Sequence, residues 1–375
     1  MGLLTLFAFR KKLFCYDYDV HSKQLLTEFN TTQNLFEVIT GRKEVDLLSD
    51  ESIQKYYDGK RVLITGAGGT IGSAVARRLV EANIKETFYL DRDESALHAL
   101  ALSMSNTAAS HSENCIVSDV RDVSGLMTIL DELKPSVVIH TAALKHLVVL
   151  ERFPREGVLT NVFGTLNVLK ASIASGVSQI LNVSTDKAAR PTSILGKTKL
   201  IAEHLTQECS SKLMLTSSVR FGNVFASRGS VIETFIHQIK NDLPVTVTHP
   251  EVTRFFMSHN EAANLILASC AMKKNATFVQ EMGTRISIVE VVEKLGKILG
   301  KKPNIRFVGL QSGEKLHEEL YERSFLPTAS HGIVELPFNG NIGIQGLISD
   351  NALPRNHEEA TSLVEFIIKK IEDFK

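Results

Sequence analysis

Residues 61–72 read RVLITGAGGTIG, and this stretch decides the fold. Val62 to Thr65 are apolar or β-branched, which predicts a short buried strand. Four glycines lie in the turn that follows, and residues 73–84 (SAVARRLVEANI) carry apolar side chains at helical spacing. A strand, a glycine turn and a helix in this order are typical of a dinucleotide-binding unit, because the helix N-terminus attracts a pyrophosphate. The spacing is G-x-x-G-x-x-G and differs from the more usual G-x-G-x-x-G.

A second apolar run, Thr87 to Leu90, ends in Asp91. An acid about 20 residues beyond the glycines is where a carboxylate holds the ribose hydroxyl of NAD. Asp91 as a helix cap is the alternative, and the glycine turn and the acid together favour the nucleotide. Arg92 suits the additional phosphate of NADP, which Asp91 would repel. The sequence therefore predicts NAD or NADP and favours NAD.

Composition excludes several functional classes. Lysine plus arginine equals aspartate plus glutamate at 42 each in 375 residues, so no nucleic-acid partner is expected. The cysteines, Cys15, Cys115, Cys209 and Cys270, are scattered, which predicts neither a disulfide framework nor a zinc or other metal site. A reduced, cytoplasmic location fits this pattern.

The N-terminus begins with a short apolar run, MGLLTLFAF. The run is far shorter than the ~20 residues that span a bilayer, and its basic residues follow it, unlike those of a secretory signal. We therefore predict a soluble chain without a transmembrane segment, with a weak membrane-surface tether as the open alternative.

From residue 61 onward, strand and helix patterns alternate. This alternation predicts an α/β fold, a Rossmann-type doubly wound parallel sheet with a smaller C-terminal substrate-binding portion. The predicted strands are 62–65, 87–91, 115–117, 135–140, 179–183 and 213–220, with helices at 94–105, 123–133 and 161–175 among them. The predicted division is an N-terminal extension (1–58, with helices at 34–48 and 50–57), a dinucleotide-binding core (59–230), a mainly substrate-binding portion (231–325) and a loop-rich C-terminal tail with a helix at 358–375 (326–375).

Reactive side chains follow the strand at 179–183 directly. Ser184, Thr185, Asp186 and Lys187 come next in the chain. Because ligands of open α/β sheets bind beyond the carboxyl ends of the strands, the chemistry is expected there.

With these segments placed, the sequence resembles the nucleotide-sugar 4,6-dehydratases of the extended short-chain dehydrogenase/reductase superfamily. It is most similar to the polysaccharide-biosynthesis branch that acts on UDP-N-acetylglucosamine. The matching blocks are TGAGGTIG (65–72), DVRD (119–122), HTAALKHLVVLERFPREGVLTNVFGTLNV (140–168), STDKAARPTSILGKTK (184–199), VRFGNVFASRGSVIETF (219–235), PVTVTHPEVTRFFMS (244–258) and GLQSGEKLHEEL (309–320). The resemblance extends from about residue 34 to residue 322, and the blocks keep the order of the family.

The resemblance implies oxidation at sugar C4 by NAD(P)⁺, elimination of water across C5 and C6, and return of the hydride to C6. Asp186 matches the acid of the family and Lys187 matches the C5 base, with Thr185 and Lys199 completing the catalytic set. A lysine acts as a base when its pKa is lowered, for example by burial or by a neighbouring cation such as Lys199. Alone, an adjacent Asp–Lys pair would more commonly be an ordinary surface pair, but the surrounding block favours the catalytic interpretation.

Two positions depart from the family pattern. Leu195 occupies the place of the tyrosine in Y-x-x-x-K, four residues before Lys199, and cannot move a proton from O4. Longer, membrane-anchored relatives often carry methionine there, so Leu195 fits that subgroup, and weakened activity is the alternative. Gln311 and Ser312 replace arginine and proline, which removes a phosphate contact.

The resemblance assigns further residues to two groups. The residues expected at the cofactor are Gly66, Gly69, Thr70, Ile71, Gly72, Asp91, Arg92, Asp119, Val120, Ala142, Ala143, Lys145 and Lys199. Those expected at the UDP-sugar are His146, Asn223, Arg228, Val231, Thr246, Arg254, Glu314 and Lys315.

The sequence therefore predicts a lyase that dehydrates UDP-N-acetylglucosamine, or a similar UDP-N-acetylhexosamine, to a 4-keto-6-deoxy sugar nucleotide. A UDP-sugar 4-epimerase and a catalytically silent dinucleotide-binding protein are the alternatives. Relatives often self-associate, so a homo-oligomer is expected.

Overall fold

The computed structural model describes residues 32–45, 49–84, 86–104, 113–322, 328–330, 332–336, 340–348 and 353–374. The chain divides into two compact units, residues 1–43 and 44–375. In the first unit, helix α2 covers Thr32–Thr40, so it ends well before the predicted 34–48. The apolar run at the N-terminus and Cys15 lie outside the described residues.

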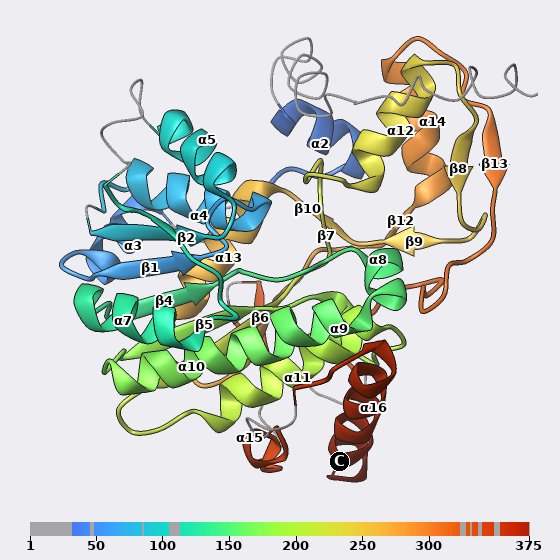
Figure 1. Ribbon diagram of the computed structural model, residues 1–375. Helices are drawn as coiled ribbons and strands as arrows, with labels where there is room; N and C mark the ends of the chain where they lie inside the picture. The colour runs from blue at the N-terminus through green and yellow to red at the C-terminus, as the bar shows by residue number, and fades with distance from the viewer. Residues whose placement is uncertain are drawn as a thin grey trace, which may run out of the picture. The chain divides into compact units, whose positions relative to one another are not determined.

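The second unit is built on a mainly parallel sheet, confirming the predicted fold class (Figure 1). The described strands follow the order β14-β15-β11-β6-β5-β4-β1-β2-β3. Their bounds are β1 Val62–Thr65, β2 Thr87–Asp91, β3 Cys115–Val117, β4 Val137–His140, β5 Gln179–Val183, β6 Leu215–Arg220, β11 Thr277–Gln280, β14 Thr328–Ser330 and β15 Ile333–Leu336. All pairs from β3 to β11 are parallel, and β15 and β14 are antiparallel to their neighbours.

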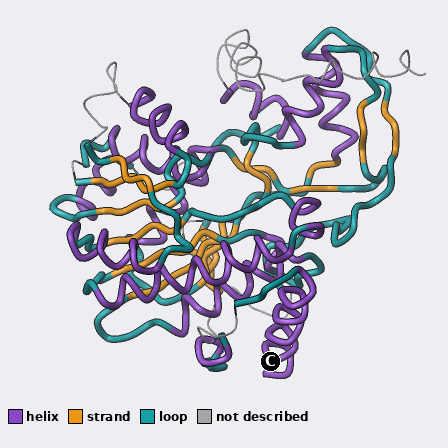
Figure 2. The backbone as a smooth tube through the Cα atoms, in the orientation of Figure 1, coloured by secondary structure: helices purple, strands orange, loops and turns teal. Residues whose placement is uncertain are grey.

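Helices cover both faces of this sheet, as its two-sided burial requires (Figures 1 and 2). One hydrophobic cluster lies under α3 (Asp50–Tyr57), α4 (Thr70–Glu81), α5 (Glu94–Met104) and α13 (His259–Ala271). The other lies under α7 (Val123–Leu133), the π-helix η1 (Val158–Phe163), α10 (Gly164–Ala174), α11 (Ile194–Glu208) and α16 (His357–Phe374). The shorter helices are α8 (Leu147–Arg152), α9 (Pro154–Gly157), η2 (Asp186–Ala188) and α15 (Ile344–Leu347).

The sheet layers use more of the chain than the predicted core, 59–230. Helix α3 belongs to them, because Ile53 and Tyr57 are fully buried and the Tyr57 hydroxyl donates to the Leu267 carbonyl at 3.1 Å. Strand β11 lies in the predicted substrate-binding portion, and β14 and β15 lie in the predicted tail. Strands this short give almost no signal of their own, because pairing in the sheet stabilises them.

A smaller portion follows β6. It contains α12 (Val231–Lys240), α14 (Ile288–Ile298) and three strand pairs. The pairs are β7 (Asn223–Val224) with β10 (Phe256–Met257), β8 (Val245–Val247) with β13 (Ile305–Phe307), and β9 (Thr253–Arg254) with β12 (Ile286–Ser287). Among the described residues, no helix combines the length and the apolar character needed to cross a bilayer.

Candidate active site

A cavity of about 730 Å³ opens at the carboxyl ends of β1, β4, β5 and β6. Its walls include the glycine turn after β1, residues 141–148 after β4, and the segments that follow β5 and β6. The smaller portion contributes Thr248, Arg254, Glu314 and Glu318. The cavity therefore joins the two parts of this unit at the edge where ligands of such sheets bind.

The glycine turn is packed too tightly for side chains. A Cβ on Gly72 would lie 2.3 Å from the Gly66 carbonyl oxygen, and one on Gly66 would lie 2.6 Å from the Ala142 backbone. Gly66 has a φ of 69°, which disfavours other residues. Gly69 is the N-cap of α4, and no described side chain caps this end, which lines the cavity. Free N–H groups at a helix N-terminus suit a diphosphate.

The acids predicted at the cofactor lie beside this turn rather than in the cavity wall. The Asp91 carboxylate accepts hydrogen bonds from the Gly68 and Asp93 amides at 2.9 and 3.0 Å. Asp119 lies 3.8 Å from Arg92 and 2.7 Å from Arg121. Burial raises the pKa of Asp119, but hydrogen bonds from Arg121 and the charges of both arginines outweigh it, so the pKa falls. Val120 and Ala142 also lie outside the cavity lining.

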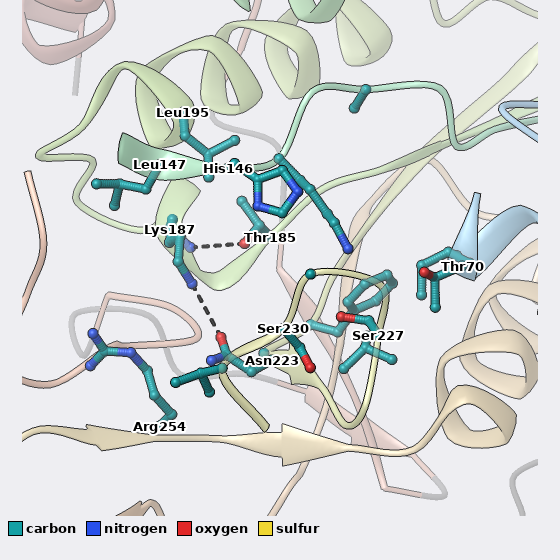
Figure 3. Close-up of a pocket in the computed structure, with 18 of the residues that line it drawn as sticks. Thr70, His146, Leu147, Thr185, Lys187, Leu195, Asn223, Ser227, Ser230 and Arg254 are labelled. Atoms are coloured by element: carbon teal, nitrogen blue, oxygen red, sulfur yellow. Dashed lines mark hydrogen bonds between the residues drawn. The ribbon is translucent and has the colours of Figure 1, made fainter. Parts of the chain in front are cut away.

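The predicted catalytic stretch forms η2 and is held by its own side chains. Thr185 caps η2, and its hydroxyl donates to Asp186 Oδ1 at 2.9 Å. Lys187 Nζ donates to the same oxygen at 2.9 Å and to Asn223 Oδ1 at 3.4 Å. The Lys187 side chain points toward Asn223, with Arg254 nearby (Figure 3). Thr185 and Lys187 line the cavity, whereas Asp186 is fully buried behind them.

The two lysines differ in pKa, and the difference corrects a prediction. Burial lowers the pKa of Lys187, but the charges of Asp186 and Glu318 outweigh it, so the pKa is raised. The lowered pKa belongs to Lys199, where burial brings it to about 8 against the opposing charge of Glu203. Lys187 is thus an ammonium group in this structure, contrary to what its predicted role as a base requires.

Helix α11 carries Leu195 and Lys199 to the cavity. Its N-terminus is fixed by Ser193, which accepts from the Gly196 amide at 3.1 Å, and by Glu151, which accepts from the Ile194 amide at 2.7 Å. A Cβ on Gly196 would lie 2.3 Å from the Lys187 carbonyl oxygen, so glycine lets η2 pack on α11. Leu195 lines the cavity at the position of the missing tyrosine.

Two conserved-looking polar contacts would have been hard to predict: those of His140 and Asn161, both fully or almost fully buried. The His140 ring bonds to Thr65 at 2.7 Å and to Thr165 at 3.1 Å, and burial together with the charge of Lys199 lowers its pKa to about 3. Asn161 in η1 accepts from the Leu144 amide at 2.8 Å and so holds the cavity wall after β4. Both act on the shape of the wall and not on a ligand.

Most residues predicted at the sugar nucleotide meet at the cavity. His146, Asn223, Arg228, Val231, Arg254 and Glu314 line it. Arg254 Nη2 donates to Glu314 Oε1 at 2.6 Å. The Arg228 amide donates to Thr70 Oγ1 at 3.4 Å, and its carbonyl accepts from Lys145 at 2.9 Å. The loop after β7 therefore contacts the predicted cofactor turn.

Two predicted residues do not reach the cavity, and two others replace them. Thr246 is exposed and accepts from Gln238 at 2.9 Å, whereas Thr248 lines the cavity on the same strand direction. Lys315 donates to the Ala189 carbonyl at 2.7 Å, whereas Glu318 lines the cavity. Glu318 lies in the block GLQSGEKLHEEL, but nothing in the letters distinguishes it from Glu319.

The sheet, the glycine turn and the shared cavity define a Rossmann-type protein of the extended short-chain dehydrogenase/reductase class. Residues 62–332 match the family described as "Polysaccharide biosynthesis protein", and the chain belongs to this family. The predicted resemblance to the polysaccharide-biosynthesis branch is thereby confirmed.

Relatives and solved structures agree with this assignment. The capsular polysaccharide biosynthesis protein CapD of Staphylococcus aureus is 37% identical over 77% of this chain and 49% of its own length. A UDP-glucose 4-epimerase of Rickettsia canadensis is 35% identical over 70% of this chain and 77% of its own. The X-ray structure of Pen from Bacillus thuringiensis matches with a TM-score of 0.66 and 34% identity, covering 72% of this chain and 85% of its own. The chain spans about half the length of the first two curated relatives.

Proposed function

We propose that this chain is an NAD-dependent enzyme that dehydrates UDP-N-acetylglucosamine, or a similar UDP-N-acetylhexosamine, to a 4-keto-6-deoxy sugar nucleotide. The observation that carries the proposal is the single cavity that joins the glycine turn to Thr185, Lys187 and Arg254. Solved structures of the same fold include a dTDP-glucose 4,6-dehydratase with bound NAD. The family description supports a role in polysaccharide biosynthesis.

The residues at the glycine turn fit a nicotinamide dinucleotide. The uncapped N-terminus of α4 would hold the diphosphate, and Asp91 would hold the adenosine ribose. Arg92 already faces Asp119 at 3.8 Å, which supports NAD over NADP. When bound, this cofactor accepts a hydride and returns it.

The polar residues of the cavity divide the remaining work. Leu195 has no proton to exchange, so the Thr185 hydroxyl, bonded to the buried Asp186 carboxylate, is the route for the proton of the C4 hydroxyl. Arg254 is held by Glu314 with its guanidinium at the cavity, where it would bind the diphosphate. Asn223 and Lys187 lie together and would contact the sugar.

The assay for this function uses purified protein, NAD⁺ and UDP-N-acetylglucosamine. We expect mass spectrometry to show a product lighter by one water. Lys187→Ala should lower turnover by about 10²–10⁴-fold while NAD⁺ binding persists, because it removes a proton-transfer group. Unchanged mass with a galacto-configured product by NMR would instead establish the 4-epimerase, which the names of several relatives favour. Unchanged substrate would contradict both activities on this sugar.

The cofactor turn is tested by Gly72→Ala. The new Cβ would meet the Gly66 carbonyl oxygen at 2.3 Å and the Ala67 Cα at 2.7 Å, so the backbone must move. We expect NADH affinity, measured by fluorescence titration, to fall at least ~10-fold, which corresponds to about 1.4 kcal/mol. Gly346→Ala in α15 is the matched control, because its Cβ would meet no atom within 4 Å. Equal NADH affinity in the Gly72→Ala variant would show that the diphosphate does not bind here.

A further inference from the structure

Two carboxylates flank the ammonium group of Lys187, and they face different surroundings. Asp186 Oδ1 lies 2.9 Å from Lys187 Nζ, and Glu318 Oε1 lies 3.6 Å from it. Asp186 is fully buried and is absent from the cavity wall, whereas Glu318 lines the cavity. Of the two, Glu318 is the carboxylate that a sugar bound in the cavity can touch.

The second oxygen of Glu318 is unusual for a buried carboxylate. Glu318 is 1% exposed, and its Oε2 atom accepts no hydrogen bond from any described residue. The nearest described cation to this oxygen is Lys315 Nζ, at 3.7 Å. A buried carboxylate oxygen without a donor is costly, and such atoms call for a functional explanation. Its lone pairs are free to accept a proton.

Lys187 is arranged to donate and not to accept. Its Nζ faces three oxygens, from Asp186, Glu318 and Asn223. An ammonium group has protons to donate and no lone pair to accept one. The neighbours of Lys187 therefore suit an acid, and the free oxygen of Glu318 suits a base.

We propose that Glu318 is the base that removes the C5 proton, and that the Lys187 ammonium is the acid that protonates the leaving C6 hydroxyl. Asp186 then becomes a positioning residue, which holds Lys187 and Thr185 through one oxygen. The inference rests on the proposed dehydration and exchanges the roles that the family resemblance implies for these residues.

The step balances within the cavity. The C5–H bond breaks, its proton goes to Glu318 Oε2, and its electron pair forms the C5–C6 double bond as the C6–O bond breaks. The departing oxygen takes a proton from Lys187 and leaves as water. The hydride taken from C4 then adds to C6 while Glu318 returns its proton to C5. The proton released from O4 during oxidation restores the Lys187 ammonium.

The test compares Glu318→Gln with Glu319→Gln in D₂O, using NAD⁺ and UDP-N-acetylglucosamine. Glu319 is the adjacent carboxylate, 3.6 Å from Arg190 and outside the cavity wall, so its variant serves as the control. In Glu318→Gln we expect C4 oxidation to persist, seen as reduced-cofactor absorbance at the active site. Water loss and deuterium incorporation at C5 should fall by about 10²–10⁴-fold. Glu319→Gln should behave as the wild type does.

A second variant separates the chemical role from a structural one. Glu318→Ala opens space for a small carboxylate, so added formate should restore water loss in this variant but not in Lys187→Ala. Wild-type deuterium incorporation in Glu318→Gln would overturn the inference. Loss of C4 oxidation together with elimination, or failure of both Glu318 variants to fold, would also overturn it by making Glu318 structural. Wild-type protein that leaves the sugar unchanged would instead contradict the proposed function.

Discussion

Replacing Glu203 with glutamine is expected to lower the free energy of unfolding by about 3–5 kcal/mol. Glu203 on α11 and Arg220 at the end of β6 form a buried two-bond pair, with N–O distances of 2.8 and 2.6 Å. Their side chains are 3% and 11% exposed. The substitution leaves the Arg220 guanidinium buried without its counter-charge, which costs more than the pair itself contributes.

Urea unfolding of three variants measures this effect. Asp131→Asn removes the exposed partner of Lys134 and should cost less than ~1 kcal/mol. The double variant Glu203→Leu with Arg220→Met removes both charges, and we expect it to be more stable than Glu203→Gln. If Glu203→Gln and Asp131→Asn cost the same, the buried pair does not contribute in this way.

Replacing Lys199 with methionine is expected to stabilise the protein at pH 7 by about 3 kcal/mol. Burial lowers the pKa of Lys199 from 10.5 to about 8 in the folded chain. Between these two values the unfolded chain binds a proton that the folded chain does not, so stability from this group rises with pH across that window. Below pH 8 the folded protein carries the full cost of a buried ammonium group, and methionine removes that cost.

The stability difference between this variant and the wild type should therefore shrink as the pH rises from 8 toward 10.5. Denaturant titrations at pH 7, 8.5 and 10 measure the difference directly, so that titrations common to both proteins cancel. Lys197→Met is the matched control, because Lys197 lies on the same helix and pairs with the half-exposed Glu365. A Lys199→Met variant no more stable than the wild type at pH 7 would contradict the buried-charge argument.

The sequence was sufficient to predict the main fold because its signals are local. The run before Gly66, the acid at Asp91 and the alternation that follows each depend on neighbouring residues, and β1, β2, β3 and β5 match their predicted bounds. The position of Thr185 and Lys187 at the cavity followed from the rule that parallel strands end at one edge. Helix α12 also matches its predicted bounds, 231–240.

The features that could not be predicted depend on contacts between distant segments. Glu318 approaches Lys187 only in the folded chain, and that approach reverses the expected direction of the Lys187 pKa. The alternation of β8 places Thr246 outward, and register of this kind is set by the partner strand β13. Strand β11 gave no signal, because its pairing with β6 and β15 stabilises it.

The position of β15 has a consequence for synthesis on the ribosome. Proteins are made from the N-terminus, and β1 to β6 can pair as soon as their crossover helices emerge. Strand β11 then presents a free edge until residues 333–336 have left the exit tunnel, and an unpaired edge is a template for aggregation. The last strands thus act as a late-arriving guard, fastened by the contact of Lys274 with Glu335 at 2.6 Å. Messenger-RNA truncations that stop before codon 333 would release chains whose nucleotide fold is already assembled but whose edge stays open.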